Sequence, residues 1–432
     1  MSKIIFLTKN QLGFLSNNID IVIQSGMADI SDIAVCDMGS TDGTLEYLCG
    51  RGIDYVAGTI EEDGFGVMIN TALNEFSKDE DFLLLGADCI IMPEDYLRAK
   101  KYIDINRDVL AYTFEREFAR ETEPSESKEE ENPVQTLYLK WYAAFFVSEK
   151  FKELGGFDDN LKLPHNVCAD ISFRAITKDI RCEEFCGLKV YKYEPEINEA
   201  EDLIHDRGVL KPKWGMNYFN VGSNDVLLSL IVDRDREEAI NFLEIGCDCG
   251  GNLLGVKKMF KNASLYGVEI NENSARISSH LADVVCGNIE EQNLDFGETK
   301  MDYIMFGDVL EHLRDPLQTI IYCKSLLKEG GAVIASIPNL AHFTVIKELL
   351  NGRFEYSDTG LLDRTHIHFF TGIEIIKMFE EADYEVKELR SMYIPQTLSE
   401  ADEMFVKKLL AMGRADESNL RTYQYHVLAK KR

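Results

Sequence analysis

Short apolar and β-branched runs alternate with amphipathic stretches in two series along the chain. In the first series the strand-like runs are 4–8, 33–37, 55–57 and 82–85, with a helical stretch at 67–76. In the second they are 242–245, 264–269, 303–306, 332–337, 385–390 and 424–428, with a helix at 253–260. This strand–helix–strand rhythm predicts parallel sheets covered by helices. We therefore predict an α/β protein with two tandem domains.

Two polar stretches interrupt these series. Residues 115–133 are net acidic and contain two prolines, and strand-like sequence resumes at 136–147. We expect a mobile loop there, inside the first domain. Residues 194–207 have little regular pattern and precede a helix expected at 217–232. The predicted domains are therefore 1–207 and 208–432.

Net charge, the lengths of the apolar runs and the cysteine spacing exclude some classes of function. Of 432 residues, 75 are acidic and 46 basic, which gives a net charge of −29. Such a chain repels phosphate backbones, so we expect no nucleic-acid partner. No apolar run approaches the roughly 18–20 residues that span a bilayer, and the first residues lack signal-peptide features. The ten scattered cysteines lack paired zinc-finger spacing, which favours reduced thiols in a cytoplasmic protein.

A glycine-rich turn follows the first strand of the second series. The strand at 242–245 runs into Gly246, Cys247, Asp248, Cys249, Gly250 and Gly251, and a helix follows. Such a turn lets a ligand approach the backbone closely. The next strand ends in Glu269, which can accept hydrogen bonds from ribose hydroxyls. These features alone fit a dinucleotide equally well.

Five segments, taken in their order along the chain, indicate which cofactor this turn binds. FLEIGCDCGG, YGVEIN, CGNIE, MDYIMFGDVLEHLRDP and LLKEGGAVIASIPN resemble the class I S-adenosylmethionine-dependent methyltransferases over residues 214–432. The resemblance implies a Rossmann-like fold that an antiparallel strand pair closes, with S-adenosylmethionine as cofactor. Implied cofactor contacts are Glu244, Gly246 and Gly250 at the methionine end, Glu269 at the ribose, Asn288 and Ile289 beside the adenine, and Asp308 near the methionine moiety or reaction centre. Asp248 replaces the middle glycine of the usual turn, so its side chain either crowds the cofactor or points outward.

The DVLEH segment carries the candidate chemistry. Methyl transfer needs alignment and often a base for the acceptor hydroxyl, and His312 is our candidate base. Asp308, Glu311 and His312 also resemble an arrangement with which some O-methyltransferases of this class hold magnesium. The alternative is that Glu311 and His312 only cap and orient the following turn.

An insertion at about 338–371 is rich in aromatic, His, Asp and Arg residues. In this methyltransferase subgroup similar sequence forms a cap over the acceptor. The expected acceptor contacts are Tyr356, Asp363, Arg364, His366 and His368, with Phe370 stacking on a sugar face. The alternative is a packed lid with an internal Asp363–Arg364 ion pair.

The first domain has polar residues at its strand ends. The sequence from Asp37 to Thr44 forms a tight turn opening a helix, in which Thr41 or Asp42 could be the N-cap. Gly86-Ala87-Asp88 follows the strand at 82–85, and a Gly-Gly-Phe-Asp segment precedes Ala169-Asp170. In this order the motifs resemble family 2-like glycosyltransferases of the GT-A fold over residues 1–207.

That resemblance implies a nucleotide-sugar site. Thr8, Asp37 and Asp42 would bind the nucleotide, and Asp88 would hold a divalent cation (Mn or Mg) on the donor diphosphate. Asp170 would be the general base, and His205 would reach the metal or diphosphate. The family has two acidic residues at each of two positions. Here Gly86-Ala87-Asp88 and Ala169-Asp170 each keep only one of them.

The combined expectation is a bifunctional enzyme. The first domain would transfer a sugar from a nucleotide-sugar donor, with inversion, to a glycan or glycolipid of a bacterial surface polysaccharide. The second would methylate a sugar hydroxyl, and a lipid-linked acceptor would bring the protein to a membrane surface. The alternative is an active methyltransferase whose N-terminal domain is a degenerate sugar-nucleotide, carbohydrate-binding or docking module.

Overall fold

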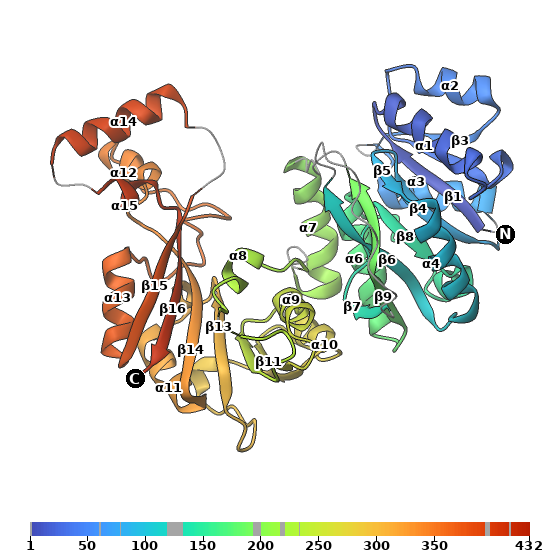
Figure 1. The fold of residues 1–432 in the computed structure, drawn as a ribbon. Helices are drawn as coiled ribbons and strands as arrows, with labels where there is room; N and C mark the ends of the chain where they lie inside the picture. The colour runs from blue at the N-terminus through green and yellow to red at the C-terminus, as the bar shows by residue number, and fades with distance from the viewer. Residues whose placement is uncertain are drawn as a thin grey trace. The chain divides into compact units, whose positions relative to one another are not determined.

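The computed structural model divides the chain into two compact units, Met1–Val221 and Gly222–Arg432 (Figure 1). It describes residues 2–59, 62–77, 79–118, 133–192, 200–216, 221–232, 234–393, 398–413 and 416–432. Within these ranges, no helix has both the length and the apolar character needed to cross a membrane.

A mixed sheet forms the centre of the first unit. Its strands are β1 (Ser2–Thr8), β2 (Ile33–Asp37), β3 (Asp54–Ala57), β4 (Asp81–Gly86), β5 (Cys89–Ile91), β6 (Val109–Phe118), β7 (Val134–Thr136), β8 (Ala143–Phe146) and β9 (Arg181–Lys192). The order is β3-β2-β1-β4-β8-β6-β9-β5, and β7 pairs with β9. Strands β3, β2, β1 and β4 are parallel, and β8 runs antiparallel to β4.

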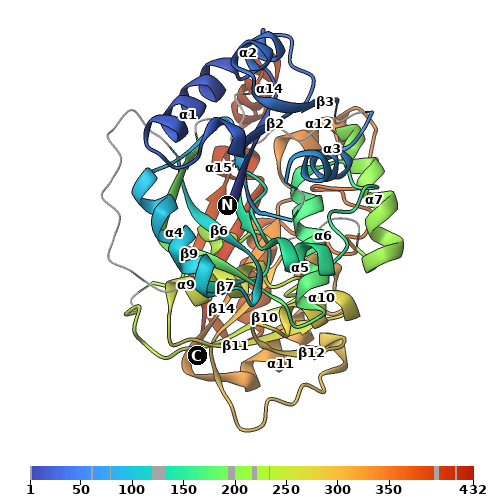
Figure 2. The ribbon, with the colours of Figure 1, turned by 90° about the vertical axis from the view of Figure 1, so that its right-hand side faces the viewer.

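Helices cover both faces of this sheet. They are α1 (Leu12–Gln24), α2 (Thr44–Arg51), α3 (Phe65–Ala72), α4 (Pro93–Ile105), α5 (Ser148–Glu153), α6 (Pro164–Ile176) and α7 (Ala200–Trp214), with short turns η1 (Ile30–Asp32) and η2 (Leu73–Ser77). Figure 2 shows α1 and α4 on one side of the sheet and α3, α5 and α6 on the other. Burial on both faces explains why β1 and β2 are continuous apolar runs rather than alternating ones.

Three expectations for the connecting segments need correction. The acidic loop was expected from residue 115, but β6 continues to Phe118; residues 119–132 lie outside the described residues. The irregular stretch at 194–207 overlaps α7, so the predicted boundary at 207 falls inside a helix. Its charged sequence has little amphipathic pattern, although Leu210 and Trp214 are buried. In place of the helix expected at 217–232, the described residues contain only α8 (Asp225–Leu228), and 217–220 are not described.

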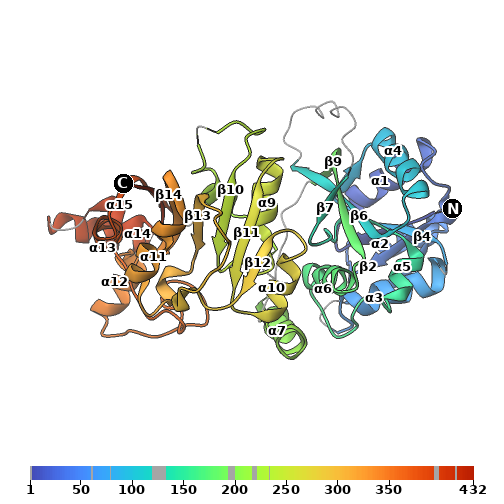
Figure 3. The same cartoon turned by 90° about the horizontal axis from the view of Figure 1, so that it is seen from below.

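The second unit has a seven-stranded sheet among its described residues. Its strands are β10 (Asn241–Ile245), β11 (Ser264–Glu269), β12 (Asp283–Cys286), β13 (Met301–Gly307), β14 (Leu327–Pro338), β15 (Tyr384–Met392) and β16 (Gln424–Lys431). The order is β12-β11-β10-β13-β14-β16-β15, and Figure 3 shows β10, β11 and β13 side by side. The first five strands are parallel and β16 is antiparallel to both neighbours, as predicted for the closing pair.

Helices also cover both faces of the second sheet. They are α8, α9 (Gly251–Met259), α10 (Glu272–Ser278), α11 (Pro316–Leu326), α12 (Phe343–Leu350), α13 (Gly372–Glu381), α14 (Glu400–Ala411) and α15 (Glu417–Arg421), with turns η3 (Ile289–Glu291) and η4 (Leu310–His312). One apolar core includes α8 and α9, and a second includes α11 and α13. The carboxyl ends of β10 to β14 share one edge, where open α/β sheets bind ligands.

The predicted cap at 338–371 is part of a larger substructure. Phe343 of α12, Val406 of α14 and Leu420 of α15 form a small apolar core. Lys347 donates to Asp402 at 2.7 Å between α12 and α14. The cap therefore also includes residues beyond 398, which the local sequence pattern did not reveal.

Candidate functional site

The turn after β10 has no room for a side chain at Gly246. This glycine has φ of 71°, and a Cβ there would lie 2.7 Å from Val309 Cγ2. Gly250, which precedes α9, has φ of 85°. Both conformations favour glycine, so the sequence of the turn follows from its geometry.

The side chain of Asp248 is tied to α10. Its Oδ1 accepts a 2.9 Å hydrogen bond from Ser274 Oγ, and its backbone has φ of 44°. Asp and Asn tolerate this left-handed region better than most side chains. The sequence left open whether this side chain crowds the cofactor or points outward. In the structure it is bonded to the neighbouring helix α10.

Glu269 closes the same turn from the end of β11. Its Oε2 accepts from the Asp248 amide at 2.8 Å and its Oε1 from the Asn271 amide at 2.7 Å. Burial is the main cause that raises the pKa of this carboxyl. A carboxylate has about four acceptor positions, so acceptor capacity remains for ribose hydroxyls.

Glu244 presents an unpartnered oxygen inside the second unit. Its Oε1 accepts from Asn252 Nδ2 at 2.7 Å, and Asn252 Oδ1 accepts from the Asn224 amide at 2.7 Å. Its Oε2 is buried and makes no hydrogen bond. Burial raises the pKa of Glu244 to about 8. A cationic donor such as the ammonium of a methionine moiety would satisfy this oxygen.

Asn288 and Ile289 follow β12 on the same edge of the sheet. Asn288 Oδ1 accepts from the Glu290 amide at 3.0 Å and so caps η3. Ile289 is buried in the core that includes α11 and α13. Their predicted place beside an adenine is compatible with this position and stays a prediction.

Asp308 follows β13 with φ of 55°. Its amide donates to Ser336 Oγ at 3.0 Å, and its carboxylate accepts from Gln424 Nε2. The side chain reaches solvent, yet the protein atoms crowded around it raise the pKa of the carboxyl to about 6. Gln424, on the antiparallel strand β16, is a partner that sequence reasoning missed.

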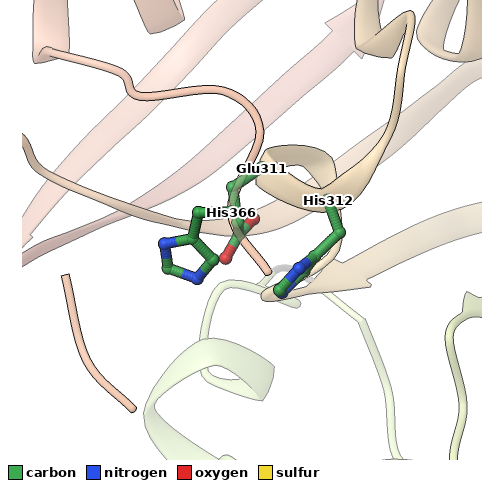
Figure 4. Close-up of side chains that lie close together, drawn as sticks. All are labelled: Glu311, His312 and His366. Carbon is green, nitrogen blue, oxygen red and sulfur yellow. The ribbon is translucent and has the colours of Figure 1, made fainter. Parts of the chain in front are cut away.

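Glu311, His312 and His366 lie together just beyond Asp308 (Figure 4). One ligand-type atom from each lies within 4.8 Å of the others. Among the described residues this is the one such group of three or more His, Cys, Asp or Glu residues. The expected magnesium set was Asp308, Glu311 and His312, but Asp308 is outside the group and His366 of the cap is inside it.

The polar residues expected to bind an acceptor are mostly engaged within the cap. Asp363 Oδ1 accepts from the Thr365 amide at 2.8 Å, and Arg364 pairs with Asp358 at 2.7 Å. The ion pair is thus not the Asp363–Arg364 pair that the lid alternative expected. His368 Nε2 contacts the Arg314 carbonyl at 3.1 Å.

Exposed aromatic rings lie beside His366. Tyr356 is 49% exposed and Phe354 is 41% exposed. Both contact the ring of Phe369, which lies 6.3 Å from the ring of His366. Phe370, expected to stack on a sugar, is buried instead. The cap therefore offers ring surfaces rather than free polar groups.

In the first unit, Thr8 and Asp37 end neighbouring strands. They are register partners in β1 and β2. Asp37 Oδ1 accepts from the Gly39 and Ser40 amides at 3.1 and 2.9 Å. Asp37 Oδ2 and Thr8 Oγ1 are buried without a hydrogen-bond partner. These two atoms are unsatisfied polar groups at one edge of the sheet.

The other residues predicted to bind a nucleotide-sugar are either bonded to protein groups or buried. Asp42 accepts from the Thr44 hydroxyl at 2.6 Å and the Leu12 amide at 2.9 Å, so it joins the starts of α1 and α2. Asp88 is buried just after β4. His205, on α7, contacts the Asn160 carbonyl through Nε2 at 3.0 Å.

Asp170, the predicted general base of the first unit, is surrounded by protein donors. The residue lies in the middle of α6 and is fully buried. Its carboxylate accepts from Arg174 at 2.8 Å, Lys213 at 2.7 Å and Trp214 Nε1 at 2.8 Å. A base must reach the acceptor hydroxyl, which this carboxylate could do only if the surrounding donors moved, so its role as general base stays a prediction.

Comparison with known proteins gives matches to methyltransferases. A family profile described as a methyltransferase domain matches residues 224–389. Ubiquinone biosynthesis O-methyltransferase of Cereibacter sphaeroides is 28% identical over 150 residues, which are 32% of this chain and 60% of the relative. The protein of the same name from Dinoroseobacter shibae is 28% identical over 163 residues, 36% of this chain and 64% of the relative. The chain thus spans less than two thirds of these relatives.

A crystal structure of a SAM dependent methyltransferase from Archaeoglobus fulgidus is also similar. It has 18% sequence identity and covers 52% of this chain and 99% of its own, with a TM-score of 0.35. The family match and the strand order agree on the second unit. It contains a class I S-adenosylmethionine-dependent methyltransferase domain over residues 224–389, with the Rossmann-like fold of that class.

Proposed function

We propose that the second unit transfers a methyl group from S-adenosylmethionine to a hydroxyl group of an acceptor held under the cap. The observation that carries this proposal is the buried, unpartnered Oε2 of Glu244, which lies next to the glycine-rich turn that begins at Gly246. An ammonium group would satisfy that oxygen, and the glycine-rich turn would hold the rest of the cofactor. The cofactor supplies an electrophilic methyl group on a sulfonium.

The chain's own residues would position and deprotonate the acceptor. Glu269 would hold the ribose of the cofactor. His312 is exposed on the loop after β13 and is the proposed base for the hydroxyl proton. Its Nδ1 lies 3.2 Å from the Thr365 carbonyl, which leaves Nε2 free to accept a proton.

Two acceptor classes deserve a test. The sequence resemblance favours a sugar hydroxyl of a glycan or glycolipid. The exposed rings of Phe354 and Tyr356 also fit an aromatic hydroxyl, and the relatives are named as ubiquinone biosynthesis O-methyltransferases. Rings stack on both aromatic and sugar faces, so an acceptor hydroxyl next to a flat apolar surface is the shared chemistry.

Transfer of labelled methyl groups tests this function. Wild-type protein would be incubated with S-adenosylmethionine labelled in the methyl group and with panels of glycans and of phenols. We expect label in one panel, and at least a tenfold loss with Glu269→Gln. Glu272→Gln, on the exposed surface of the next helix, is the matched control. Absence of cofactor binding in wild-type protein would refute the proposal.

A second candidate function concerns the first unit. We propose that it binds a nucleotide or nucleotide-sugar as a GT-A-like module, and the two unpartnered buried atoms of Thr8 and Asp37 support this. Since Asp170 is enclosed, binding without sugar transfer is the form that we favour. Asp88 remains the proposed holder of a manganese or magnesium ion on the diphosphate, and His205 a proposed second contact.

Calorimetry with UDP, GDP and dTDP, with and without manganese, tests the module. We expect one nucleotide to bind the full chain and to bind at least tenfold more weakly to Asp37→Asn. Glu46→Gln, exposed on α2, should behave as wild type. Turnover of a nucleotide-sugar that survives in Asp37→Asn would contradict the assignment.

A further inference from the structure

The carboxylate of Glu311 is buried without any hydrogen bond. Glu311 is 1% exposed, and neither Oε1 nor Oε2 has a partner. A buried carboxylate in that state is costly unless a cation or donor satisfies it. Capping does not explain it, because only the main-chain carbonyl of Glu311 is used, by the Ile367 and His368 amides at 3.0 Å.

Two imidazoles face this carboxylate. Figure 4 shows the Glu311 carboxylate between the rings of His312 and His366. The ring centroids of these histidines are 4.8 Å apart. His312 comes from η4 and His366 from the cap, so the group joins two segments that are distant in sequence.

Hydrogen bonds fix which ring nitrogen is free. His312 Nδ1 lies 3.2 Å from the Thr365 carbonyl, and His366 Nδ1 lies 3.2 Å from the Leu361 carbonyl. A carbonyl only accepts, so each Nδ1 carries the proton and each Nε2 has a free lone pair. Metal-binding histidines are typically oriented in this way by a second hydrogen bond.

We propose that Glu311, His312 and His366 bind a divalent transition-metal ion of the manganese, iron, cobalt or zinc class. Two imidazoles and one carboxylate suit these ions, whereas magnesium prefers oxygen ligands in an octahedral shell. The set differs from the magnesium set that the sequence predicted, because Asp308 is bonded to Gln424 and His366 replaces it.

The assignment goes beyond the methyl-transfer proposal and changes one role in it. Three protein ligands leave coordination positions open, as in catalytic rather than structural sites. An acceptor hydroxyl bound there would lose its proton to solvent more readily. His312 would then be a metal ligand instead of the base, and His366 would not contact the acceptor.

Metal binding to the full chain tests the proposal. Protein without an affinity tag would be stripped with EDTA, dialysed, and titrated with Zn²⁺, Mn²⁺ or Mg²⁺ by calorimetry, and with Co²⁺ by absorption. We expect one Zn²⁺ or Mn²⁺ per chain, bound at least tenfold more tightly than Mg²⁺. His366→Gln should weaken binding at least tenfold. His368→Gln is the matched control, because this histidine lies two residues away and bonds Arg314 instead.

Glu311→Gln separates loss of ligand from loss of fold. We expect it to bind metal at least tenfold more weakly while its melting temperature without metal equals or exceeds that of wild type. Binding of S-adenosylhomocysteine should be retained in all three variants, so failure of the metal site is distinguishable from failure of the cofactor site. No stoichiometric metal in wild type, Mg²⁺ binding as tightly as Zn²⁺, or wild-type affinity in His366→Gln would each overturn the proposal.

Discussion

The indole N–H of Trp214 donates a 2.8 Å hydrogen bond to the buried carboxylate of Asp170. Trp214 ends α7, and Asp170 lies in α6, so the bond joins two helices that the sequence separates by a weakly patterned stretch. Lys213 and Arg174 complete the set of donors. The arrangement makes Asp170 an anchor for α7 inside the first unit.

Replacing this anchor should destabilise the protein. We expect Asp170→Asn to lower the free energy of unfolding of the first unit by about 1–3 kcal/mol, because a fully buried group loses its charge-assisted hydrogen bonds with Arg174 and Lys213, which are themselves partly exposed. Thermal unfolding measures this, with Asp179→Asn as an exposed control on the turn after α6. An unchanged melting temperature together with lost nucleotide-sugar turnover would restore Asp170 as a catalytic base.

Glu244 should make stability depend on pH. Burial, and then the charges of Asp248 and Glu269, raise its pKa in the folded protein to about 8, from an ordinary value of 4.5. The folded state therefore binds the proton more tightly than the unfolded chain between these values. Stability from this group is full below about 4.5 and is lost as pH rises toward about 8, by at most about 1.4 kcal/mol per pH unit.

Glu244→Gln isolates this effect. The variant lacks the titrating group, so its melting temperature relative to wild type should rise steadily as pH increases from about 5 to 8. Melting curves at matched ionic strength provide the comparison. A difference between the two proteins that does not change with pH would show that Glu244 keeps an ordinary pKa.

The turn at Gly246 should not tolerate a side chain. In Gly246→Ala the methyl group would meet Val309 in a left-handed backbone, and we expect S-adenosylhomocysteine to bind at least tenfold more weakly. Gly297→Ala is a matched control, with φ of 62° and no neighbour within 4 Å of the added Cβ. Both variants should lose about 1–2 kcal/mol of stability from the backbone alone. Equal cofactor affinity in the two would contradict a role for the packed turn at Gly246 in cofactor binding.

The exposed rings of the cap should affect binding of the acceptor and leave cofactor binding unchanged. We expect Tyr356→Ala to raise KM for the acceptor several-fold with little change in kcat or in cofactor affinity. Because the ring is half exposed, stability should change by less than about 0.5 kcal/mol. Ile373→Ala, exposed on α13, is the control. A loss of kcat without a change in KM would assign Tyr356 to another role.

The sequence predicted β1 to β4 of the first unit and every strand of the second unit except β12, but it missed β5, β6 and β9 of the first unit. β2 and β11 begin and end at the predicted residues, and β2 is buried along its whole length, as expected for a strand covered on both faces. β12 was missed because it is short and only partly buried. The helix α7 was missed because its apolar residues show little helical periodicity.

Side chains at strand ends could be placed from the sequence, but contacts between distant segments could not. Glu244 and Glu269 follow from parallel strands that share a carboxyl edge. The cap brings His366 to Glu311, and no local pattern reports such a contact. The same holds for Gln424 and Asp308, which meet only because β16 runs beside β14.

The most direct test of the account is calorimetric binding of S-adenosylhomocysteine to the full chain and to Glu269→Gln. We predict one site per chain in wild type, affinity reduced at least tenfold in Glu269→Gln, and wild-type affinity in Glu272→Gln. No binding to the folded wild-type chain, or equal affinity in Glu269→Gln, would contradict a cofactor site at the carboxyl edge of β10 and β11.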